Sequence, residues 1–395
     1  MSKTTFSNFN LFDGKENKIV NNAWITVDDK SGKIVNLGTS IPPESDRRVN
    51  LKGKYVIPGL IDVHCHIATD PKATDFRYED SETELAVYAY QNLRRLLKNG
   101  VTFGRGCGTN YDIDIKLNKM VKAGTLKDIP GFLPCGRAFS MTGGHSDGPH
   151  MSFLVDSKDE MRKGVRTALK NGAKLIKMMA TGGVMSIQDY MGDPQLSTEE
   201  MHTGVVEAHH KGVKTAAHAE GNPGIQNALD AGIDSIEHGF YTTQKQAQQM
   251  VKQGTYLTPT IIAEWSIAKK GPEFLPKWEV KKAKDALNDT IKNFKVAYKT
   301  GVKFTLGTDA GTPFNFFDKT PVELELLTKI GMSSFEAFQC SYINSAQLCG
   351  IEKDYGTLEV NKYADFLVLD SDPLADIKSV QQKDKQVYVH GKREF

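Results

Sequence analysis

Between residues 56 and 308 the sequence alternates short apolar runs with longer amphipathic segments, and this alternation limits the fold more than any other feature. Short apolar runs predict buried strands, and amphipathic segments between them predict helices that connect parallel strands. Eight strand-then-helix units fit, which predicts an α/β fold and a (β/α)8 TIM barrel. A doubly wound open sheet is the alternative, but no Gly-x-Gly-x-x-Gly turn follows an early strand. The predicted strands are 56–66, 101–103, 131–139, 173–180, 213–219, 234–238, 255–261 and 303–308, and the predicted helices are 81–97, 111–123, 158–171, 197–211, 224–231 and 243–253.

The two ends of the chain differ from the middle in the secondary structure that their sequence predicts. Residues 6–12, 23–27 and 33–35 predict short strands separated by turns, and 364–369 and 386–389 predict short strands again. We expect these strands to pair with each other in a small β-sandwich domain built from residues 1–57 and 355–395. The barrel domain then spans 58–354, with helical segments at 321–329 and 333–349 completing it.

Charge and composition exclude several classes of partner. Fifty Lys and Arg residues against 48 Asp and Glu residues leave a net charge of +2 without a long block of one sign. We therefore expect no binding to nucleic acid or to an anionic membrane. The first ten residues lack a signal-peptide core, and no apolar run is long enough to span a bilayer, so we expect a cytoplasmic protein. Its five scattered cysteines are typical of buried thiols in a reducing compartment.

Polar residues with metal-binding chemistry occur at the ends of the predicted barrel strands, where such folds carry their active sites. His64 and His66 are separated by one residue, so alternation along a strand places both imidazoles on one face. The other strand-borne candidates are Lys177, His218, His238 and Asp309.

Lys177 lies in an otherwise apolar strand, and burial disfavours the charged form of a lysine. A neutral amine can add carbon dioxide and become a carbamate, whose two oxygens bridge two cations. Four histidines, one aspartate and a carbamate supply ligands for two divalent ions roughly 3.5–4 Å apart. This ligand set suits zinc best, although manganese, cobalt or nickel would also fit.

At these positions the sequence resembles the metal-dependent amidohydrolase superfamily. Within it, the resemblance is closer to the zinc-dependent dipeptidases and carboxypeptidases, which include prolidase-like and Xaa-Arg/Lys-cleaving enzymes, with ochratoxin-hydrolysing amidases nearby. The resemblance covers nearly the whole chain. It depends on the motifs PGLIDVHCH (58–66), TGGH (142–145), LIKMMATGGVMS (175–186), AHA (217–219), IEHG (236–239), GTDAG (307–311), GTLE (356–359) and ADFLVL (364–369).

The resemblance implies a role for each matching position. His64, His66 and Asp309 would bind one metal, His218 and His238 the other, and carboxylated Lys177 would bridge them. His145 would contact the substrate near the scissile group, and Tyr241 is a weaker candidate for that task. Asp62 is either a second-layer group or a buried structural carboxylate, and His209 and His210 are expected on the surface.

The expected reaction is hydrolysis of an amide bond by a metal-bridging hydroxide, with Asp309 as general acid and base. Asp309 would thus be both ligand and catalyst. Alternatives are a one-metal deaminase or imidazolonepropionase-like hydrolase, a lactonase or phosphotriesterase-like hydrolase with paired metals, and a relative that has lost its chemistry.

The substrate is expected to be a dipeptide or an N-acyl amino acid with a free carboxylate. Loop acids at Asp147, Asp189 and Asp193 are candidates to face a basic side chain or are simply solvated. The lysine-rich segment 263–300 is either a solvated helical insertion or a lid over the barrel mouth. The resemblance also implies a homo-oligomer.

Overall fold

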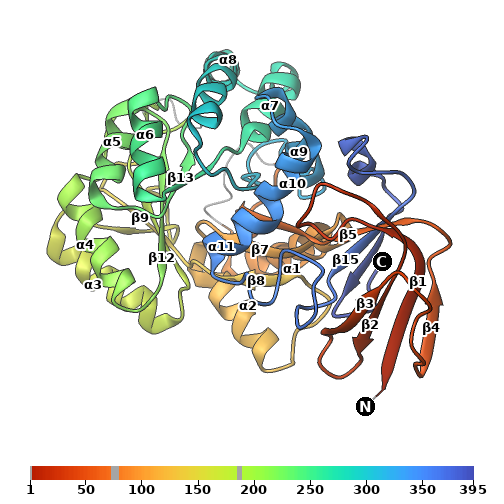
Figure 1. The fold of residues 1–395 in the computed structure, drawn as a ribbon. Helices are drawn as coiled ribbons and strands as arrows, with labels where there is room; N and C mark the ends of the chain where they lie inside the picture. The colour runs from red at the N-terminus through yellow and green to blue at the C-terminus, as the bar shows by residue number, and fades with distance from the viewer. Residues whose placement is uncertain (1, 73–79, 185–188) are drawn as a thin grey trace.

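Strands from both ends of the chain form one sheet at the side of the molecule, and parallel strands with their helices form the rest (Figure 1). The structure is a computed structural model that describes residues 2–72, 80–184 and 189–395. Met185 and Ser186, at the end of the 175–186 motif, lie outside these ranges.

The first sheet, called the end sheet below, has eight strands in the order β17-β16-β15-β5-β1-β2-β3, with β4 also paired to β1. Its strands are β1 (Lys3–Leu11), β2 (Val20–Asp28), β3 (Ile34–Gly38), β4 (Arg47–Asn50), β5 (Tyr55–Pro58), β15 (Phe366–Leu369), β16 (Gln386–Val389) and β17 (Lys392–Arg393). The two chain ends therefore build one unit, as predicted. The domain limits at residues 57 and 354 stay a prediction.

The expected sandwich needs correction, because hydrogen bonds place all eight strands in a single branched sheet. The sheet curves strongly. Phe6 on β1 meets Phe366 on β15 and Tyr388 on β16, with ring centroids 5.2 and 5.3 Å apart. This curvature lets one sheet enclose an apolar core of its own.

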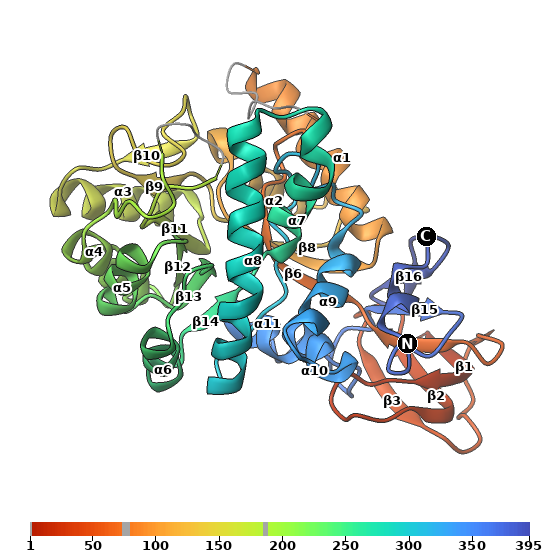
Figure 2. The same cartoon turned by 90° about the horizontal axis from the view of Figure 1, so that it is seen from above.

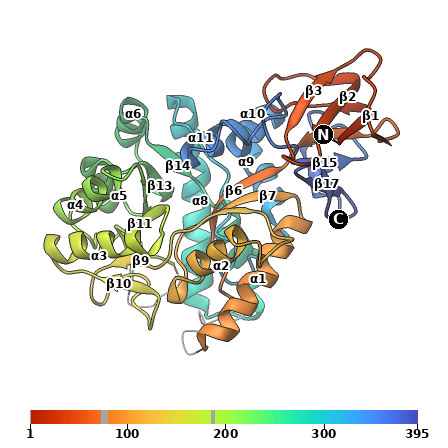
Figure 3. The same ribbon diagram turned by 90° about the horizontal axis from the view of Figure 1, so that it is seen from below.

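The parallel strands form two further sheets, one of three strands and one of six. They are β6 (Leu60–Cys65), β7 (Val101–Gly106) and β8 (Gly131–Leu133) in the first, and β9 (Ala138–Ser140), β10 (Ser152–Leu154), β11 (Leu175–Met179), β12 (Lys214–Ala219), β13 (Ser235–His238) and β14 (Tyr256–Thr258) in the second. The predicted strand 131–139 is divided between β8 and β9, and β10 was not predicted. Figure 3 shows β6 running from the end sheet into this part of the molecule.

Regular strand pairing does not run unbroken around an eight-stranded barrel in the described residues, which corrects part of the fold prediction. The predicted eighth strand, 303–308, forms one isolated bridge among the described residues, between Phe304 and Leu257. Its backbone nevertheless connects β14 to β6: the Thr305 amide donates to Leu257 and the Val63 amide donates to Leu306, at 3.0 and 2.8 Å. The segment also passes very close to its neighbours, because a Cβ at Gly307 would lie 2.3 Å from the Thr258 side chain.

Helices follow most of the parallel strands, as the alternation predicts. They are α1 (Glu82–Lys98), α2 (Ile113–Lys122), α3 (Lys158–Asn171), α4 (Thr198–His209), α5 (Asn222–Ala231), α6 (Gln244–Gln253), α7 (Ile261–Lys270), α8 (Lys277–Thr300), α9 (Thr320–Lys329), α10 (Ser334–Gln339) and α11 (Ser345–Cys349). The serine and glutamate at 197 and 200 form the predicted capping box of α4.

The long helical region up to residue 300 consists of α7 and α8, which are separated by a break at Gly271 to Pro276. Figure 2 shows α8 crossing the middle of the molecule, between the β11–β14 side and α9. No helix of the described residues is both long and apolar enough to cross a membrane. All five cysteines are free thiols, and every one except Cys349 is buried.

Candidate active site

A small cavity of about 50 Å³ lies where β11, β12 and β13 end, with room for a few water-sized groups. Ten of its fifteen lining residues are polar, and twelve of the fifteen are buried. The lining residues are His66, His145, Ser146, Met151, Lys177, Met179, Val184, His218, Glu220, His238, Ala263, Glu264, Ile267, Asp309 and Thr312.

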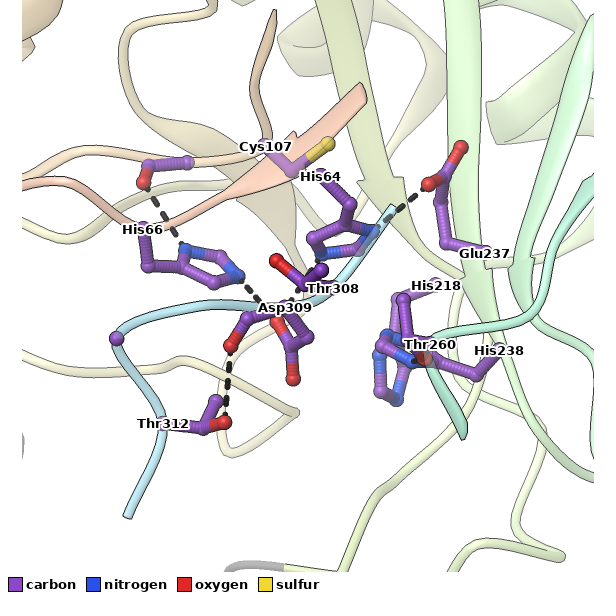
Figure 4. Close-up of polar contacts among 12 residues, drawn as sticks. His64, His66, Cys107, His218, Glu237, His238, Thr260, Thr308, Asp309 and Thr312 are labelled. Carbon is purple, nitrogen blue, oxygen red and sulfur yellow. Dashed lines mark hydrogen bonds and ion pairs between the residues drawn. The ribbon is translucent and has the colours of Figure 1, made fainter. Parts of the chain in front are cut away.

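On one side of the cavity the structure brings together three predicted ligands, His64, His66 and Asp309 (Figure 4). The Nε2 atoms of His64 and His66 lie 3.2 and 3.0 Å from the same carboxylate oxygen of Asp309. Burial favours the neutral acid, but the contacts with both imidazoles outweigh it and hold the pKa of Asp309 well below its ordinary value. Asp309 is therefore an anion next to two imidazoles.

The other two histidines, His218 and His238, end β12 and β13 on the opposite side, with ring centroids 4.6 Å apart. Burial lowers the pKa of both imidazoles well below the ordinary value. Both rings are therefore neutral near pH 7, and the neutral ring is the form that binds metal ions.

All four histidines share a feature that is typical of metal ligands: a protein group holds one ring nitrogen, which leaves the other available. The contacts are His64 Nδ1 to Glu237 Oε2 (2.7 Å), His66 Nδ1 to the Gly108 carbonyl (3.2 Å), His218 Nε2 to the Gly182 carbonyl (3.0 Å) and His238 Nδ1 to the Thr260 hydroxyl (2.7 Å). The free Nε2 of His64 is buried and has no hydrogen-bond partner in the described chain. These residues therefore fit a metal centre.

Lys177 on β11 is only 1 % exposed and lines the same cavity. Within the described ranges its amine forms no ion pair or hydrogen bond with a carboxylate. A buried amine without an acceptor is costly, so this position favours a chemical change that supplies one. The carbamate expected from the sequence would do so.

Glu237 was not predicted from the sequence, and it orients His64 through the contact with Nδ1. Its second oxygen accepts a 2.8 Å hydrogen bond from Arg105, whose Nε also donates to the Val63 carbonyl at 2.5 Å. Burial opposes ionisation, but the charge of Arg105 and the contact with His64 hold the pKa of Glu237 well below its usual range. A glutamate in the middle of the buried IEHG strand was a signal for such a pair, since a buried charge needs a partner.

His145 lies where the resemblance implies, beside the candidate ligands. Its ring stacks on His218 with centroids 4.2 Å apart and an interplanar angle of 13°, and its Nδ1 lies 2.6 Å from a carboxylate oxygen of Asp189. Gln195 donates to the other oxygen of Asp189 at 2.7 Å. Asp189 therefore holds His145 and is not available to a basic substrate group.

The remaining candidates lie outside the cavity. Tyr241 is half-buried and is not among the cavity-lining residues, because the chain turns away after β13 at Gly239, where φ is +67°. Asp62 is buried and accepts the Thr308 and Thr320 hydroxyls at 2.7 and 2.9 Å and the backbone amide of His64 at 3.2 Å. The other loop acids and helix histidines are exposed: Asp147, Asp193, His209 and His210.

Two glutamates that were not predicted line the cavity. Glu220 follows β12, and Glu264 lies in the first turn of α7. Burial and the neighbouring carboxylates raise the pKa of both well above the ordinary value. Neither followed from the sequence, because helical spacing cannot tell that α7 begins inside the cavity wall.

Backbone strain marks the same region. His238, Thr260 and Asp309 have φ of +69°, +47° and +59°, in the left-handed region that side chains other than glycine rarely adopt. Such a conformation costs about 1 kcal/mol or more per residue, and it persists where the surrounding structure enforces it. Two candidate ligands and the residue that holds one of them share this strain.

The sequence profile of the amidohydrolase family matches residues 55–393, and the chain belongs to that family. The ochratoxinase of Aspergillus niger is 30 % identical over 398 residues, which cover 91 % of this chain and 80 % of the relative. A solved Xaa-Pro dipeptidase with bound methionine superposes with a TM-score of 0.91 at 29 % identity and 99 % coverage of both chains. A prolidase complexed with N-methylphosphonate-L-proline gives 0.91 at 25 % identity, also with 99 % coverage of both.

Family membership makes the chain a hydrolase of C–N bonds, as the sequence predicted. Superposition on these relatives implies a TIM barrel with a small additional domain. Members of this superfamily generally use divalent metal ions, and the histidine and acid groups described above could hold them.

Proposed function

We propose that the chain is a binuclear metal-dependent hydrolase that cleaves an amide bond in a dipeptide or an N-acyl amino acid. The names of its relatives support the substrate class, since they include an ochratoxinase and an Xaa-Pro dipeptidase. A cytoplasmic location and assembly into a homo-oligomer stay predictions from the sequence.

The observation that carries the proposal is the arrangement of six side chains around one cavity. Each of the four imidazoles has one nitrogen held by the protein and one left over. Asp309 and Lys177 line the cavity with three of these histidines, and the fourth, His64, contacts Asp309 at 3.2 Å. In the described part of the chain the Lys177 amine has no carboxylate partner. His64, His66 and Asp309 would hold one divalent ion, and zinc is the ion to test first. His218 and His238 would hold the second, and carboxylated Lys177 would bridge the two. Bound there, such ions lower the pKa of water and polarise a carbonyl group.

The chain's own residues supply the remaining steps. Asp309, an anion at the cavity wall, accepts the proton of the attacking water and returns it to the leaving amine. His145 lines the cavity and its Nδ1 contacts Asp189, so with both ring nitrogens protonated its Nε2 would donate a hydrogen bond to the carbonyl oxygen as negative charge develops there.

The test combines metal analysis with a substrate panel. Metal-loaded protein is assayed on dipeptides, N-acyl amino acids, lactones, phosphotriesters and aminopurines, and metal per chain is measured by mass spectrometry. We expect amide hydrolysis and two metal ions per chain. A single ion with deaminase activity, or turnover of lactones alone, would contradict the proposal.

The role of Asp309 is tested by Asp309→Asn, with Asp318→Asn as the control because Asp318 is an exposed acid on the following loop. Loss of the proton acceptor should lower kcat by at least about 100-fold. The control should keep its activity. Near-normal kcat in Asp309→Asn would show that another group moves the proton.

A further inference from the structure

Two buried carboxylates, Glu220 and Glu264, face the cavity without the partners that buried acids normally have. They are 3 % and 5 % exposed, and both line the cavity. The Oε2 atom of each is buried and has no hydrogen-bond partner in the described parts of the chain. Two unpaired buried oxygens on one cavity wall are costly unless a ligand satisfies them.

Both side chains start from fixed backbone. The Glu220 amide donates to the Thr181 hydroxyl at 3.0 Å. Glu264 lies in the first turn of α7, and the first two amides of this helix, at Ile261 and Ile262, donate to the Glu323 carboxylate at 2.9 and 2.8 Å. The backbone from which each side chain starts is therefore held by hydrogen bonds.

A third acid lies close to the two glutamates. Asp309 lines the same cavity, so three acidic side chains belong to its lining. The nearest loop acid, Asp189, already holds His145. A charged N–H group can donate to two carboxylates at once, and such charge-assisted hydrogen bonds are among the strongest in proteins.

The position of Glu220 favours a cation close to the reacting centre. Glu220 follows His218 by two residues, and its Oε1 lies 3.7 Å from Nε2 of that ring. With His218 and His238 it could also hold a metal ion, which the metal analysis of the variants below distinguishes from ammonium binding. In a dipeptide the α-ammonium is attached to the carbon next to the scissile carbonyl, so it must sit beside the reacting centre. A lysine or arginine side chain would place its charge several bonds further away.

We infer that Glu220 and Glu264 bind the free α-ammonium group of the substrate, which makes this enzyme a dipeptidase in preference to a hydrolase of N-acyl amino acids. This inference rests on the proposed amide hydrolysis and narrows its substrate class.

The test uses matched substrate pairs that differ only in the ammonium group: Ala-Phe with propanoyl-Phe, Ala-Pro with propanoyl-Pro and Ala-Lys with propanoyl-Lys. In each pair that the wild type cleaves, we expect the dipeptide to have the higher kcat/KM. Glu264→Gln should lower kcat/KM for the dipeptide at least tenfold, mainly through KM, and change that for the propanoyl compound less than threefold. Glu264→Asp, which keeps the charge, should recover part of the loss.

Glu279→Gln is the matched control. Glu279 is a buried glutamate outside the cavity lining, and one of its oxygens also has no hydrogen-bond partner within the described ranges. This control should leave kcat/KM unchanged for both the dipeptide and the propanoyl compound. Glu220→Gln repeats the test if Glu264→Gln does not fold. Metal per chain is measured for every variant, and loss of metal would make these glutamates ligands and overturn the inference.

Different outcomes would overturn ammonium binding and the proposed amide hydrolysis. Equal losses on both members of a pair, or a wild type that prefers the propanoyl compound, would overturn ammonium binding while amide hydrolysis stands. A metal-loaded wild type that cleaves neither member of any pair, nor any other amide, would overturn the proposed function itself.

Discussion

The choice between the two nitrogens of a single histidine decides whether His64 can bind a metal. Glu237 is held as an anion by Arg105, so it accepts a hydrogen bond from Nδ1–H of His64. The neutral ring then has its lone pair on Nε2, the nitrogen beside Asp309. A neutral glutamine at this position could not serve Arg105 and His64 with the same geometry. If the glutamine NH2 group faced Arg105, two donors would meet. If it donated to Nδ1 of His64 instead, the ring proton would lie on Nε2, and Nε2 could not bind a metal.

Glu237→Gln should therefore lower metal affinity by about 10- to 100-fold, measured by competition with a chelator. The control is Asp234→Asn, because Asp234 makes a 2.7 Å contact with His209 at the surface and far from the cavity. Unchanged metal affinity in Glu237→Gln would show that the orientation of His64 does not depend on this carboxylate.

A carbamate on Lys177 should be visible directly. Protein loaded with metal in ¹³C-labelled bicarbonate is expected to show a carbamate carbon signal by NMR, because Lys177 is buried beside the candidate ligands and its amine has no acceptor among the residues that the structure describes. Lys177→Met should lose the signal, and Lys174→Met, an exposed lysine next to the same strand, should keep it. Two bound metals without a carbamate signal would refute the modification.

At the scale of single residues, the sequence predicted most of the candidate site residues but not all of the residues that contact them. Alternation along β6 placed His64 and His66 on one face, and strand ends brought His218, His238 and Asp309 to one cavity. Pairing between distant residues, such as Arg105 with Glu237, depends on how separate strands meet and has no local pattern. Tyr241 shows the converse, since closeness in sequence to His238 did not bring it into the cavity lining.

At the scale of elements, one hydroxyl fastens α9 to the first barrel strand. The Thr320 hydroxyl, at the start of α9, donates to Asp62 on β6 at 2.9 Å, and Thr308 donates to the same oxygen. Thr320→Val keeps the shape and removes the donor, so we expect a loss of about 1–3 kcal/mol in the free energy of unfolding. Urea denaturation measures it.

Thr290→Val on α8 is the control for this prediction, since the Thr290 hydroxyl is equally buried but has no hydrogen-bond partner among the described residues. Its replacement should be neutral or stabilising. If both variants lose the same free energy, packing rather than the hydrogen bond to Asp62 explains the effect.

Helices were predicted well at this scale because their caps and periodicity are local: the range 158–171 was predicted and observed for α3. Strands were harder. Residues 303–308 look like a strand in sequence, but they pass so close to β6 and β14 at Gly307 that regular pairing is lost. Similarly, β8 and β9 divide one predicted strand because its two halves pair with different neighbours, β7 and β11.

At the scale of the whole molecule, a buried acid joins the end sheet to the barrel. The carbonyl of Asp365 accepts the Gly59 amide at 3.0 Å, and its side chain accepts the His390 amide at 2.7 Å. Burial, against that one hydrogen bond, raises the pKa of Asp365 to about 7. The pKa of Asp365 is higher in the folded than in the unfolded state, so protonated Asp365 stabilises the fold. This contribution to the free energy of unfolding is complete below about pH 4 and is lost as the pH rises to about 7.

Asp365→Asn cannot ionise, so its unfolding free energy relative to wild type should increase with pH between about 4 and 7, by up to about 4 kcal/mol. Chemical denaturation at several pH values measures this slope. Asp28→Asn in the same sheet should show the opposite sign and at lower pH, below about 4, because hydrogen bonds from Ser31 lower the pKa of Asp28. A pH-independent difference for Asp365→Asn would contradict the assignment.

The pairing of β5 with β15 has a consequence for synthesis. Pro58 faces Phe366, so more than 300 residues must leave the ribosome before β5 gains this neighbour, a delay of about 15–60 s at ordinary translation rates. The strand with His64 and His66 follows β5 directly, and its anchor is therefore among the last parts of the nascent chain to be completed.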